Sequence, residues 1–346
     1  MENALSYFVK DGERRVPVAD RYLLPILSPS SPGTNYWDPP PPGPLNDRQR
    51  GRILLQVHQI LDLFRQYGID LKGKTLLDVG TGNGLVPRLL LELSDLEAAV
   101  GADPYHDGGH KTSWHPHDHD EALRDLRQFI GLHCPGALDL AAYDALLGYE
   151  PFAARPSLVR VETQPQKSYM FSPLGAHDLA KLGRTFDVCY CKAIEHIPDW
   201  DAVLNAMAEV TSASGVVYFK HRSFFSYLGP HRYATSNIPW GHVLLTDAEY
   251  RRFASEFHAT RATAMTDFYF GGLAYPRTTV SDLLRSARAH GLVPFAILNE
   301  SPKYIGVVTR FIDEVGGFWE IVNENYPGLS AEEMFSGIYH ILLRRA

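Results

Sequence analysis

The sequence of 346 residues is long enough to bury a large hydrophobic core, either as one domain or as two. Its formal net charge of −7 and its lack of a dense lysine or arginine run disfavour a nucleic-acid partner, because phosphate backbones bind clustered cations. No apolar run is long enough to span a bilayer, and residues 1–20 lack the regions of a signal peptide, so we expect no membrane partner.

Residues 1–51 are predicted to form an irregular arm. The run SPSSPGTNYWDPPPPGPLNDRQR is rich in proline, which fixes φ and removes N–H donors, so neither a helix nor a central strand is expected there. Tyr36 and Trp37 are large aromatic residues within this run, and such residues usually dock onto another surface. The arm is therefore either a lid over a pocket or a segment packed on the surface.

Regular structure is predicted from Arg52 onward, where ILLQVHQILDLFRQYG places its apolar residues on one helical face and Gly68 can end the helix. The run KTLLDVG then suits a buried parallel strand, Leu85 to Leu93 suits a helix, and EAAVGAD suits a second strand. This order of elements is typical of an α/β protein.

Strands and helices continue to alternate in the second half of the chain. Predicted strands are TFDVCYC, SGVVYFKHR, VPFAIL and GIYHILLRR, and the predicted helices are DAVLNAMAEV, capped by Asp199 or Asp201, and TVSDLLRSARAH, which opens with a Thr279–Asp282 capping box. Cys189 and Cys191 fall on one face of a strand and are expected to be core thiols. Together with Cys134 they make no disulfide framework, which favours a reducing cytoplasm. The alternation predicts a doubly wound, mostly parallel sheet.

Two segments interrupt this alternation, at about residues 105–165 and 223–276. Both follow the carboxyl ends of predicted strands, where ligands bind in open α/β sheets. We interpret them as substrate-side insertions into a single domain over residues 52–346.

The stretch LLDVGTGNGLV, residues 76–86, predicts a ligand-binding loop between a strand and a helix. A nucleoside-triphosphate loop would end in Gly-Lys-Ser/Thr, whereas Leu85 and Val86 follow here. The third glycine of a dinucleotide fingerprint is replaced by Leu85, and Asp78 would face a pyrophosphate unfavourably. A carboxylate at this position suits a ligand that carries an ammonium group.

This loop resembles the first motif of class I S-adenosylmethionine (SAM)-dependent methyltransferases, in which an acidic residue precedes three alternating glycines. Asp78, Gly80, Gly82 and Gly84 match it position by position, and Asp103 stands where the family binds the ribose hydroxyls. The resemblance implies a seven-stranded Rossmann-like sheet and SAM as cofactor. The residues that it implies for cofactor binding are Asp78, Gly80, Thr81, Gly82, Asn83, Gly84, Asp103, Pro104, Asp178 and Lys192.

Asp178 is assigned to the adenine because it precedes the Phe-Asp strand start, as in the family's later motifs. The spacing from Asp103 is much longer than in a minimal member, so an acid elsewhere could take this role. No Asn/Asp-Pro-Pro-Tyr motif follows the fourth strand, so amide or base N-methylation is not expected.

Methyl transfer needs in-line positioning of the acceptor and, for a hydroxyl, removal of its proton, for which histidine is suited near neutral pH. His196, after the fourth strand, is one candidate base, although in many family members this position is structural. The stretch FKHRSFFSYLGPHRYATSNIPWGH interleaves cations with aromatic residues, which suits an acceptor pocket or, alternatively, an ordinary surface loop. It supplies two further candidate bases, His221 and His231, and the candidate acceptor contacts Arg222, Tyr227, Arg232, Trp240 and His242.

The stretch YHDGGHKTSWHPHDHDE, residues 105–121, could in principle hold a transition metal. Its spacing matches no defined site, and a solvated polar loop explains the same composition. We therefore predict no tightly held metal in the site.

These features predict methyl transfer from SAM to a small-molecule acceptor, with O-methylation favoured and a histidine as general base. Two other classes remain open: a SAM-binding protein that does not methylate, and, less favoured, a nicotinamide-dependent oxidoreductase on a related sheet.

Overall fold

The computed structural model describes residues 6–18, 47–82, 84–104, 124–126, 128, 137–138, 158–159, 167–227, 229, 238–258, 262–272, 277–300 and 305–346. The chain divides into two compact units. Unit 1 comprises Met1–Pro39, Lys192–Leu204 and Phe219–Leu343, and unit 2 comprises Pro40–Cys191, Asn205–Tyr218 and Arg344–Ala346.

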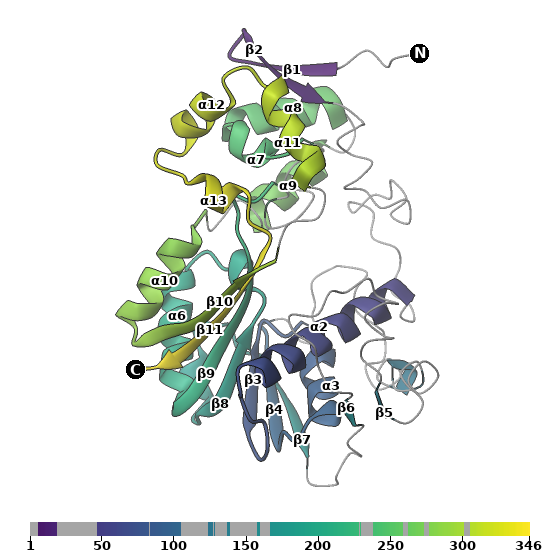
Figure 1. Cartoon of the computed structure of the whole chain (residues 1–346), viewed down its shortest axis with the longest axis vertical. Helices are drawn as coiled ribbons and strands as arrows, with labels where there is room; N and C mark the ends of the chain where they lie inside the picture. Colours follow the sequence, from purple (N-terminus) through teal and green to yellow (C-terminus); the bar gives the residue numbers. More distant parts are fainter. Residues whose placement is uncertain are drawn as a thin grey trace. The chain divides into compact units, whose positions relative to one another are not determined.

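A seven-stranded sheet in the order β10-β11-β9-β8-β3-β4-β7 confirms the predicted fold class (Figure 1). Strand β3 pairs in parallel with both β4 and β8, and β4 pairs in parallel with β7. The strands are β3 (Thr75–Val79), β4 (Ala98–Ala102), β7 (Ser168–Ser172), β8 (Phe186–Cys191), β9 (Thr211–Arg222), β10 (Leu292–Asn299) and β11 (Ile338–Arg345).

In unit 2, α3 (Leu85–Leu93) follows β3 as predicted, with apolar residues on its buried side. The preceding helix α2 (Asp47–Gln66) begins five residues before the predicted start at Arg52, and Gly68 beyond its end has the left-handed φ of +64° expected of a helix terminator. The unit also contains the short 3₁₀ helix η2 (Leu179–Leu182) and the antiparallel pair β5 (Ala137–Leu138) and β6 (Leu158–Val159).

Local sequence signals set several of the later boundaries. The side chain of Asp199 accepts a hydrogen bond from Ala202 N (3.2 Å) at the start of α6 (Trp200–Val210), which confirms one of the two predicted caps. The capping box of Thr279 and Asp282 opens α10 (Val280–Ala289), also as predicted. Cys189 and Cys191 are fully buried free thiols, which confirms them as core residues.

Unit 1 has a second hydrophobic core, separate from the residues that cover β3 and β4. It contains Phe8, Trp240, Phe253 and Phe318, all of them buried. Besides α10 and the start of α6, the described helices of unit 1 are η3 (Ile194–His196), α7 (Gly241–Leu244), α8 (Asp247–His258), α9 (Ala262–Gly272), α11 (Ile305–Glu314), α12 (Phe318–Asn325) and α13 (Ala331–Met334).

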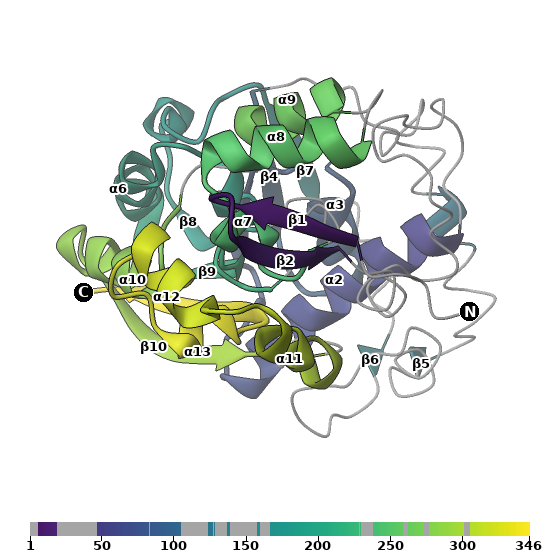
Figure 2. The same cartoon turned by 90° about the horizontal axis from the view of Figure 1, so that it is seen from above.

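The N-terminal residues supply part of this second core, so the prediction of an irregular arm is wrong for residues 6–18. Strands β1 (Ser6–Lys10) and β2 (Arg14–Val18) form an antiparallel hairpin that lies beside α8 and α11 (Figure 2). Phe8 and Val16 are cross-strand partners and both have no exposed surface. The proline-rich run that drove the prediction, with Tyr36 and Trp37, lies outside the described residues.

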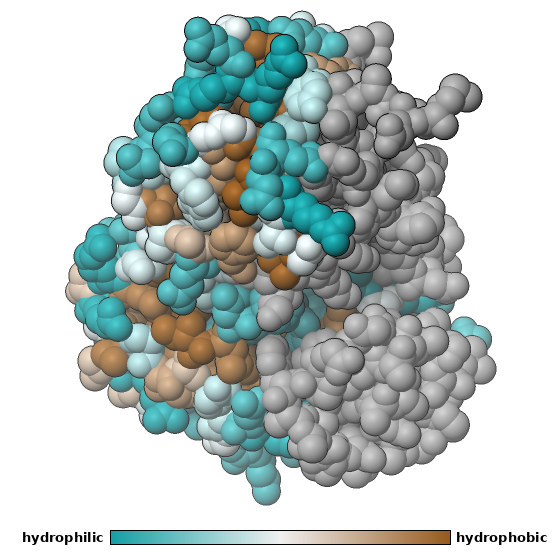
Figure 3. Space-filling view, turned by 45° about the horizontal axis from the view of Figure 1, so that its top comes forward, coloured by the Kyte–Doolittle hydropathy of each residue, from teal (hydrophilic) through white to brown (hydrophobic). Residues whose placement is uncertain are grey.

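A further segment between β10 and β11 was not foreseen as an insertion. Helices α11, α12 and α13 lie there and contribute Phe311, Phe318 and Met334 to the second core. On the surface of unit 1, apolar side chains gather where β10 lies (Figure 3), and Val293 and Ile297 of that strand are 45% and 44% exposed. No helix in the described part of the chain is long and apolar enough to cross a membrane.

Candidate active site

The glycine loop of unit 2 is tied to the ends of two neighbouring strands. Asp78 at the end of β3 is 4% exposed and accepts a hydrogen bond from Thr81 Oγ1 at 2.8 Å. The backbone N–H groups of Gly80 and Thr81 both donate to Ala102 O of β4, at 2.8 and 3.2 Å. These bonds hold the loop open as a fixed turn at the carboxyl edge of the sheet, where ligands bind in this architecture.

Gly82 lies at the centre of this loop and links it to Asp103. Its N–H donates to Asp103 Oδ2 at 3.0 Å, and Asp103, directly after β4, is 4% exposed. Gly82 has a φ of +59°, and a Cβ built on it would have no other atom within 4 Å. The loop thus presents open space beside backbone amides and two carboxylates. This donor and acceptor set fits a ligand that carries both an ammonium group and ribose hydroxyls.

Gly84 and Gly101 have a different reason to be glycine. A Cβ on either residue would collide with the hydroxyl of Tyr169, which for Gly101 would be 2.6 Å away. The ring of Tyr169 also lies 4.7 Å from the guanidinium carbon of Arg88 on α3. Gly84 therefore makes room for a tyrosine of β7, a packing role that the motif alone does not reveal.

The remaining predicted cofactor residues have more varied surroundings. Asp178 begins η2 and pairs with Lys181 at 2.8 Å, and its side chain is 48% exposed. Pro104 and Lys192 are exposed. Asn83 lies outside the described residues. The assignment of Asp178 to the adenine remains a prediction.

Of the three predicted bases, His221 has the most unusual surroundings. It lies at the end of β9 in unit 1, its side chain is 2% exposed, and neither ring nitrogen has a hydrogen-bond partner among the described residues. His196 is exposed at the end of η3, and His231 lies outside the described residues.

The neighbour of His221 is Glu195, whose Oε2 is 3.9 Å from His221 Nδ1. That oxygen is also buried without a hydrogen-bond partner in the described structure. Burial raises the pKa of Glu195, but the interaction with His221 and the charges of His196 and His221 outweigh it and hold the pKa below its usual value. Glu195 is therefore an ionised carboxylate beside a buried imidazole, which is the arrangement that orients a general base.

Sequence reasoning missed the ionisable residues that surround this pair. Lys220, adjacent to His221 on β9, is 9% exposed. Its burial, and then the charge of Lys192, lower its pKa to about 7. His340 of β11 is fully buried and its Nε2 lies 2.6 Å from Oε1 of Glu300. The consecutive Lys-His-Arg at the end of an otherwise apolar strand was a visible signal of this cluster.

Three of the predicted acceptor contacts are packed inside the second core. Tyr227, Trp240 and His242 are each at most 1% exposed. The Nε1–H of Trp240 donates to Met334 O at 3.1 Å, and His242 Nε2 lies 2.5 Å from Phe224 O. This burial favours a packing role for all three, because aromatic residues at an apolar interior position need no ligand to explain them. Arg222 is partly exposed, and Arg232 lies outside the described residues.

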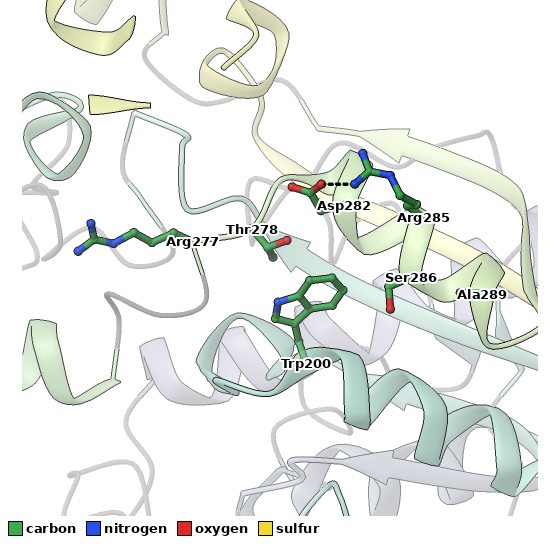
Figure 4. Close-up of a pocket in the computed structure, with 7 residues that line it drawn as sticks. All are labelled: Trp200, Arg277, Thr278, Asp282, Arg285, Ser286 and Ala289. Carbon is green, nitrogen blue, oxygen red and sulfur yellow. Dashed lines mark hydrogen bonds and ion pairs between the residues drawn. The ribbon is translucent and has the colours of Figure 1, made fainter. Parts of the chain in front are cut away.

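A pocket of about 500 Å³ also opens on unit 1, between the starts of α6 and α10 (Figure 4). Trp200 faces Thr278 and Ser286, whereas Arg277 extends away from them. The charged residues already have protein partners: Arg285 pairs with Asp282 at 2.9 Å, and Arg277 pairs with Asp247. The charged residues described at this pocket are therefore all paired with protein groups.

In the described ranges, no group of three or more histidine, cysteine or acidic residues is placed to hold a metal ion. The histidine-rich stretch at residues 105–121 lies outside those ranges.

Comparisons with known proteins identify the family of the chain. The model of the methyltransferase-domain family matches residues 48–261. A comparison with curated proteins found no match. Among solved structures, the chain is similar to magnesium protoporphyrin IX methyltransferase from Synechocystis PCC 6803 with bound S-adenosylhomocysteine, at 13% identity and a TM-score of 0.41, over 87% of this chain and 89% of that one.

The chain is also similar to the plantazolicin methyltransferase BamL in complex with a triazolic desmethylPZN analog and S-adenosylhomocysteine, at 11% identity and a TM-score of 0.39, over 86% of this chain and 85% of that one. The family match spans more than half of the 346 residues. The chain therefore belongs to the methyltransferase-domain family and is a SAM-dependent methyltransferase.

Proposed function

We propose that the protein transfers the methyl group of SAM to an oxygen of a small-molecule acceptor, with His221 as general base and Glu195 as the residue that orients it. The observation that carries this proposal is the pair of Glu195 and His221, whose facing atoms are buried, lie 3.9 Å apart and lack hydrogen-bond partners in the described structure. Buried polar groups are normally satisfied, so an unsatisfied pair at a strand end points to a group that arrives with the substrate.

The cofactor is assigned to the glycine loop of unit 2. Asp103 is proposed to bind the ribose hydroxyls, Asp78 to face the ammonium group, and the backbone at Gly82 to approach the methionine part; Asp178 and Lys192 remain proposed contacts. When bound, SAM supplies an electrophilic methyl group on a sulfonium sulfur. The support for these assignments is the open space at Gly82 and the burial of both carboxylates.

His221 is proposed to act on the acceptor alone. The acceptor O–H bond would break, and its proton would pass to a ring nitrogen of His221. The oxygen would gain the methyl group as the bond from that group to the sulfonium sulfur breaks, which leaves S-adenosylhomocysteine. Glu195 accepts from the other ring nitrogen of the resulting imidazolium and balances its charge. An ionised Glu195 is what this role needs, and the lowered pKa of that carboxyl supports it.

A small metabolite is the proposed acceptor class. The net charge of −7 supports this choice over a nucleic acid, and Arg222 at the end of β9 could bind an acidic group on the acceptor. A cytoplasmic location, the boundaries of the domain at residues 52–346 and the two insertions also remain predictions.

Methyl transfer itself is tested by incubating the protein with SAM labelled in its methyl group and fractionated metabolite extracts. We expect the labelled methyl group to appear in a small molecule that behaves on chromatography as a methyl ether or a methyl ester. Protein that binds S-adenosylhomocysteine tightly but labels nothing in any extract would contradict the proposal and favour the non-methylating alternative.

The role of His221 is tested with His221→Ala and Glu195→Gln against the acceptor found in that screen. We expect His221→Ala to lower turnover by about 10²–10⁴-fold, the usual worth of a general base, and Glu195→Gln to lower it less. The measurement is the initial rate, together with S-adenosylhomocysteine affinity by calorimetry, which should stay unchanged. His196→Ala is the matched comparison. If that variant loses turnover and His221→Ala does not, the base is His196.

A further inference from the structure

The chain leaves β9 at Ser223 and reaches α7 just after Trp240. Residues 223–227 and 238–240, together called the acceptor segment here, lie within the stretch that the sequence predicts as the acceptor wall. Its described ends are ordered by bonds of their own: Phe225 N donates to Ser223 Oγ at 3.1 Å, and Trp240 N donates to Tyr227 O at 3.0 Å. Residues 223–227 and 238–240 are all buried.

Helix α13, more than 90 residues later in the chain, binds both ends of the acceptor segment. Glu333 Oε1 accepts a hydrogen bond from Ser223 Oγ at 2.5 Å, and the neighbouring Met334 O accepts one from Trp240 Nε1 at 3.1 Å. Ser330 caps the helix by accepting from Glu333 N at 3.2 Å, which holds the backbone of Glu333 at the start of the helix.

The bonds to α13 are deep inside unit 1. Ser223 and Trp240 have no exposed surface, and Glu333 is 5% exposed. Glu333 Oε1 also accepts from Val280 N, at 3.1 Å, so one oxygen joins the acceptor segment to the start of α10. Burial raises the pKa of Glu333 although the bonds from Ser223 and Val280 lower it. Burying a carboxyl group at this position therefore costs free energy of desolvation, and an apolar side chain at the same position would cost less.

The backbone of Trp240 adds an independent sign of constraint. Its φ is +54°, and among the described residues only one other non-glycine residue, Asp11, has a positive φ. A bulky residue in the left-handed region is strained and persists only where its surroundings hold it. The indole bond to Met334 O is one of the contacts that hold it.

We propose that α13 is a positioning element for the acceptor, with Glu333 as the positioning residue. Its carboxylate fixes Ser223, two residues beyond the base His221, and its neighbour Met334 fixes the far end at Trp240. The insertion between β10 and β11 thereby sets the place of the acceptor segment. This inference rests on the proposed function of His221.

The first test measures order without any substrate. Hydrogen–deuterium exchange of the amides at residues 224–227 and 238–242 should become at least tenfold faster in Glu333→Ala. Glu333→Gln keeps an oxygen that can accept from both Ser223 and Val280, so exchange there should remain near that of the wild-type protein. Equal exchange in Glu333→Ala and the wild-type protein would overturn the proposal, whether or not an acceptor is known.

The second test measures catalysis once an acceptor is found. Glu333→Ala and Ser223→Ala should each lower kcat or raise the acceptor KM by about 10- to 100-fold, the scale of a small misplacement, with unchanged S-adenosylhomocysteine affinity. Glu333→Gln should restore most of the loss, and the double variant should lose no more than either single variant.

Val308→Ala in the second core is the control, because it removes buried apolar volume but leaves the hydrogen-bonding groups of Ser223, Trp240 and Glu333 in the chain. Loss of turnover in this variant equal to that in Glu333→Ala, at equal stability, would show a general effect of unfolding and overturn the proposal. A failure of His221→Ala to lower turnover would instead contradict the proposed base and leave the exchange result standing.

Discussion

Side chains of this protein that are equally buried differ in whether their hydrogen bonds are made. Asp78, Asp103 and His221 are all almost inaccessible to solvent, yet the carboxylates bond to the glycine loop whereas the ring nitrogens of His221 bond to nothing in the described residues. A buried polar group whose hydrogen bonds are made stabilises the conformation that makes them. A buried polar group without hydrogen bonds costs free energy until another molecule supplies a partner. This difference separates the two carboxylates, which hold the glycine loop, from His221, which is a candidate for reaction with the acceptor.

Asp103 should contribute most of its binding energy through charged hydrogen bonds to the ribose. Asp103→Ala should weaken SAM binding by about 1.5–3 kcal/mol, the worth of hydrogen bonds to a charged group, and should also leave Gly82 N without its acceptor. Titration calorimetry measures the change, with Asp313→Ala, an exposed acid on α11, as the control. Unchanged affinity in Asp103→Ala would refute the assignment of this residue to the cofactor.

His242 should make the protein sensitive to acid. Burial lowers its pKa to about 3, against 6.5 for an unfolded histidine, so between these pH values the unfolded chain binds a proton that the folded chain does not. The free energy of unfolding should therefore fall by about 1.4 kcal/mol per pH unit as pH decreases below about 6.5.

Urea denaturation of His242→Gln at several pH values between 7.5 and 4.5 measures this effect. The variant should lose stability less steeply than the wild-type protein on acidification, because glutamine binds no proton in this range. Parallel curves for the two proteins would contradict the assignment of acid sensitivity to His242.

Secondary-structure elements here take part in two different cores. Helix α3 and strand β3 bury nearly all of their apolar residues in unit 2, and local patterns predicted both. Hairpin β1–β2 buries Phe8 and Val16 in the second core of unit 1, against helices that follow it by more than 200 residues. An element whose partners are this distant in sequence cannot be recognised from its own five-residue strands.

The hairpin should be an integral part of the second core. Phe8 has no exposed surface and its ring lies 5.7 Å from that of Phe253, edge to face. Phe8→Ala should lower the free energy of unfolding by about 3–5 kcal/mol, the usual cost of removing a buried phenyl ring. Tyr7→Ala, where the side chain is 37% exposed on the other face of the same strand, is the matched control and should cost less than about 0.5 kcal/mol.

Urea denaturation of both variants distinguishes a docked hairpin from a peripheral one. A cost below about 1 kcal/mol for Phe8→Ala would show that the hairpin contributes little to the second core, since removal of a well-packed ring cannot be that cheap.

Across the whole molecule, the family motifs correctly identified the sheet and the cofactor. Asp78, the glycines and Asp103 are within about 25 residues of one another and lie on two adjacent strands, so their spacing in sequence nearly dictates their spacing in the structure. Short-range patterns are reliable when chain geometry leaves few alternatives, as it does in a strand, a tight turn and a helix.

The residues near the acceptor could not be identified from local sequence patterns, because their surroundings depend on contacts between distant segments. The sequence suggested His196, His221 and His231 alike, and only tertiary packing buries His221 beside Glu195 while it leaves His196 exposed. Likewise, the sequence suggested Tyr227 and Trp240 as pocket residues, but both are buried. Trp240 packs against Phe318 of α12 and donates to Met334 O of α13, and Tyr227 packs against Trp240. The residue type predicts that these aromatic side chains are buried, but it does not predict which element packs against them.

The amino-acid sequence by itself determined the α/β sheet, the SAM loop and the capped starts of α6 and α10, because each depends on periodicity, glycine freedom or a cap within a few residues. Tertiary structure alone decided that the N-terminal hairpin and the helices between β10 and β11 join a second core, and that Glu333 meets Ser223 across 110 positions. The physical reason is that burial and electrostatic environment are properties of neighbours in space. For distant segments, many pairings satisfy the same apolar pattern, and only the folded packing selects one.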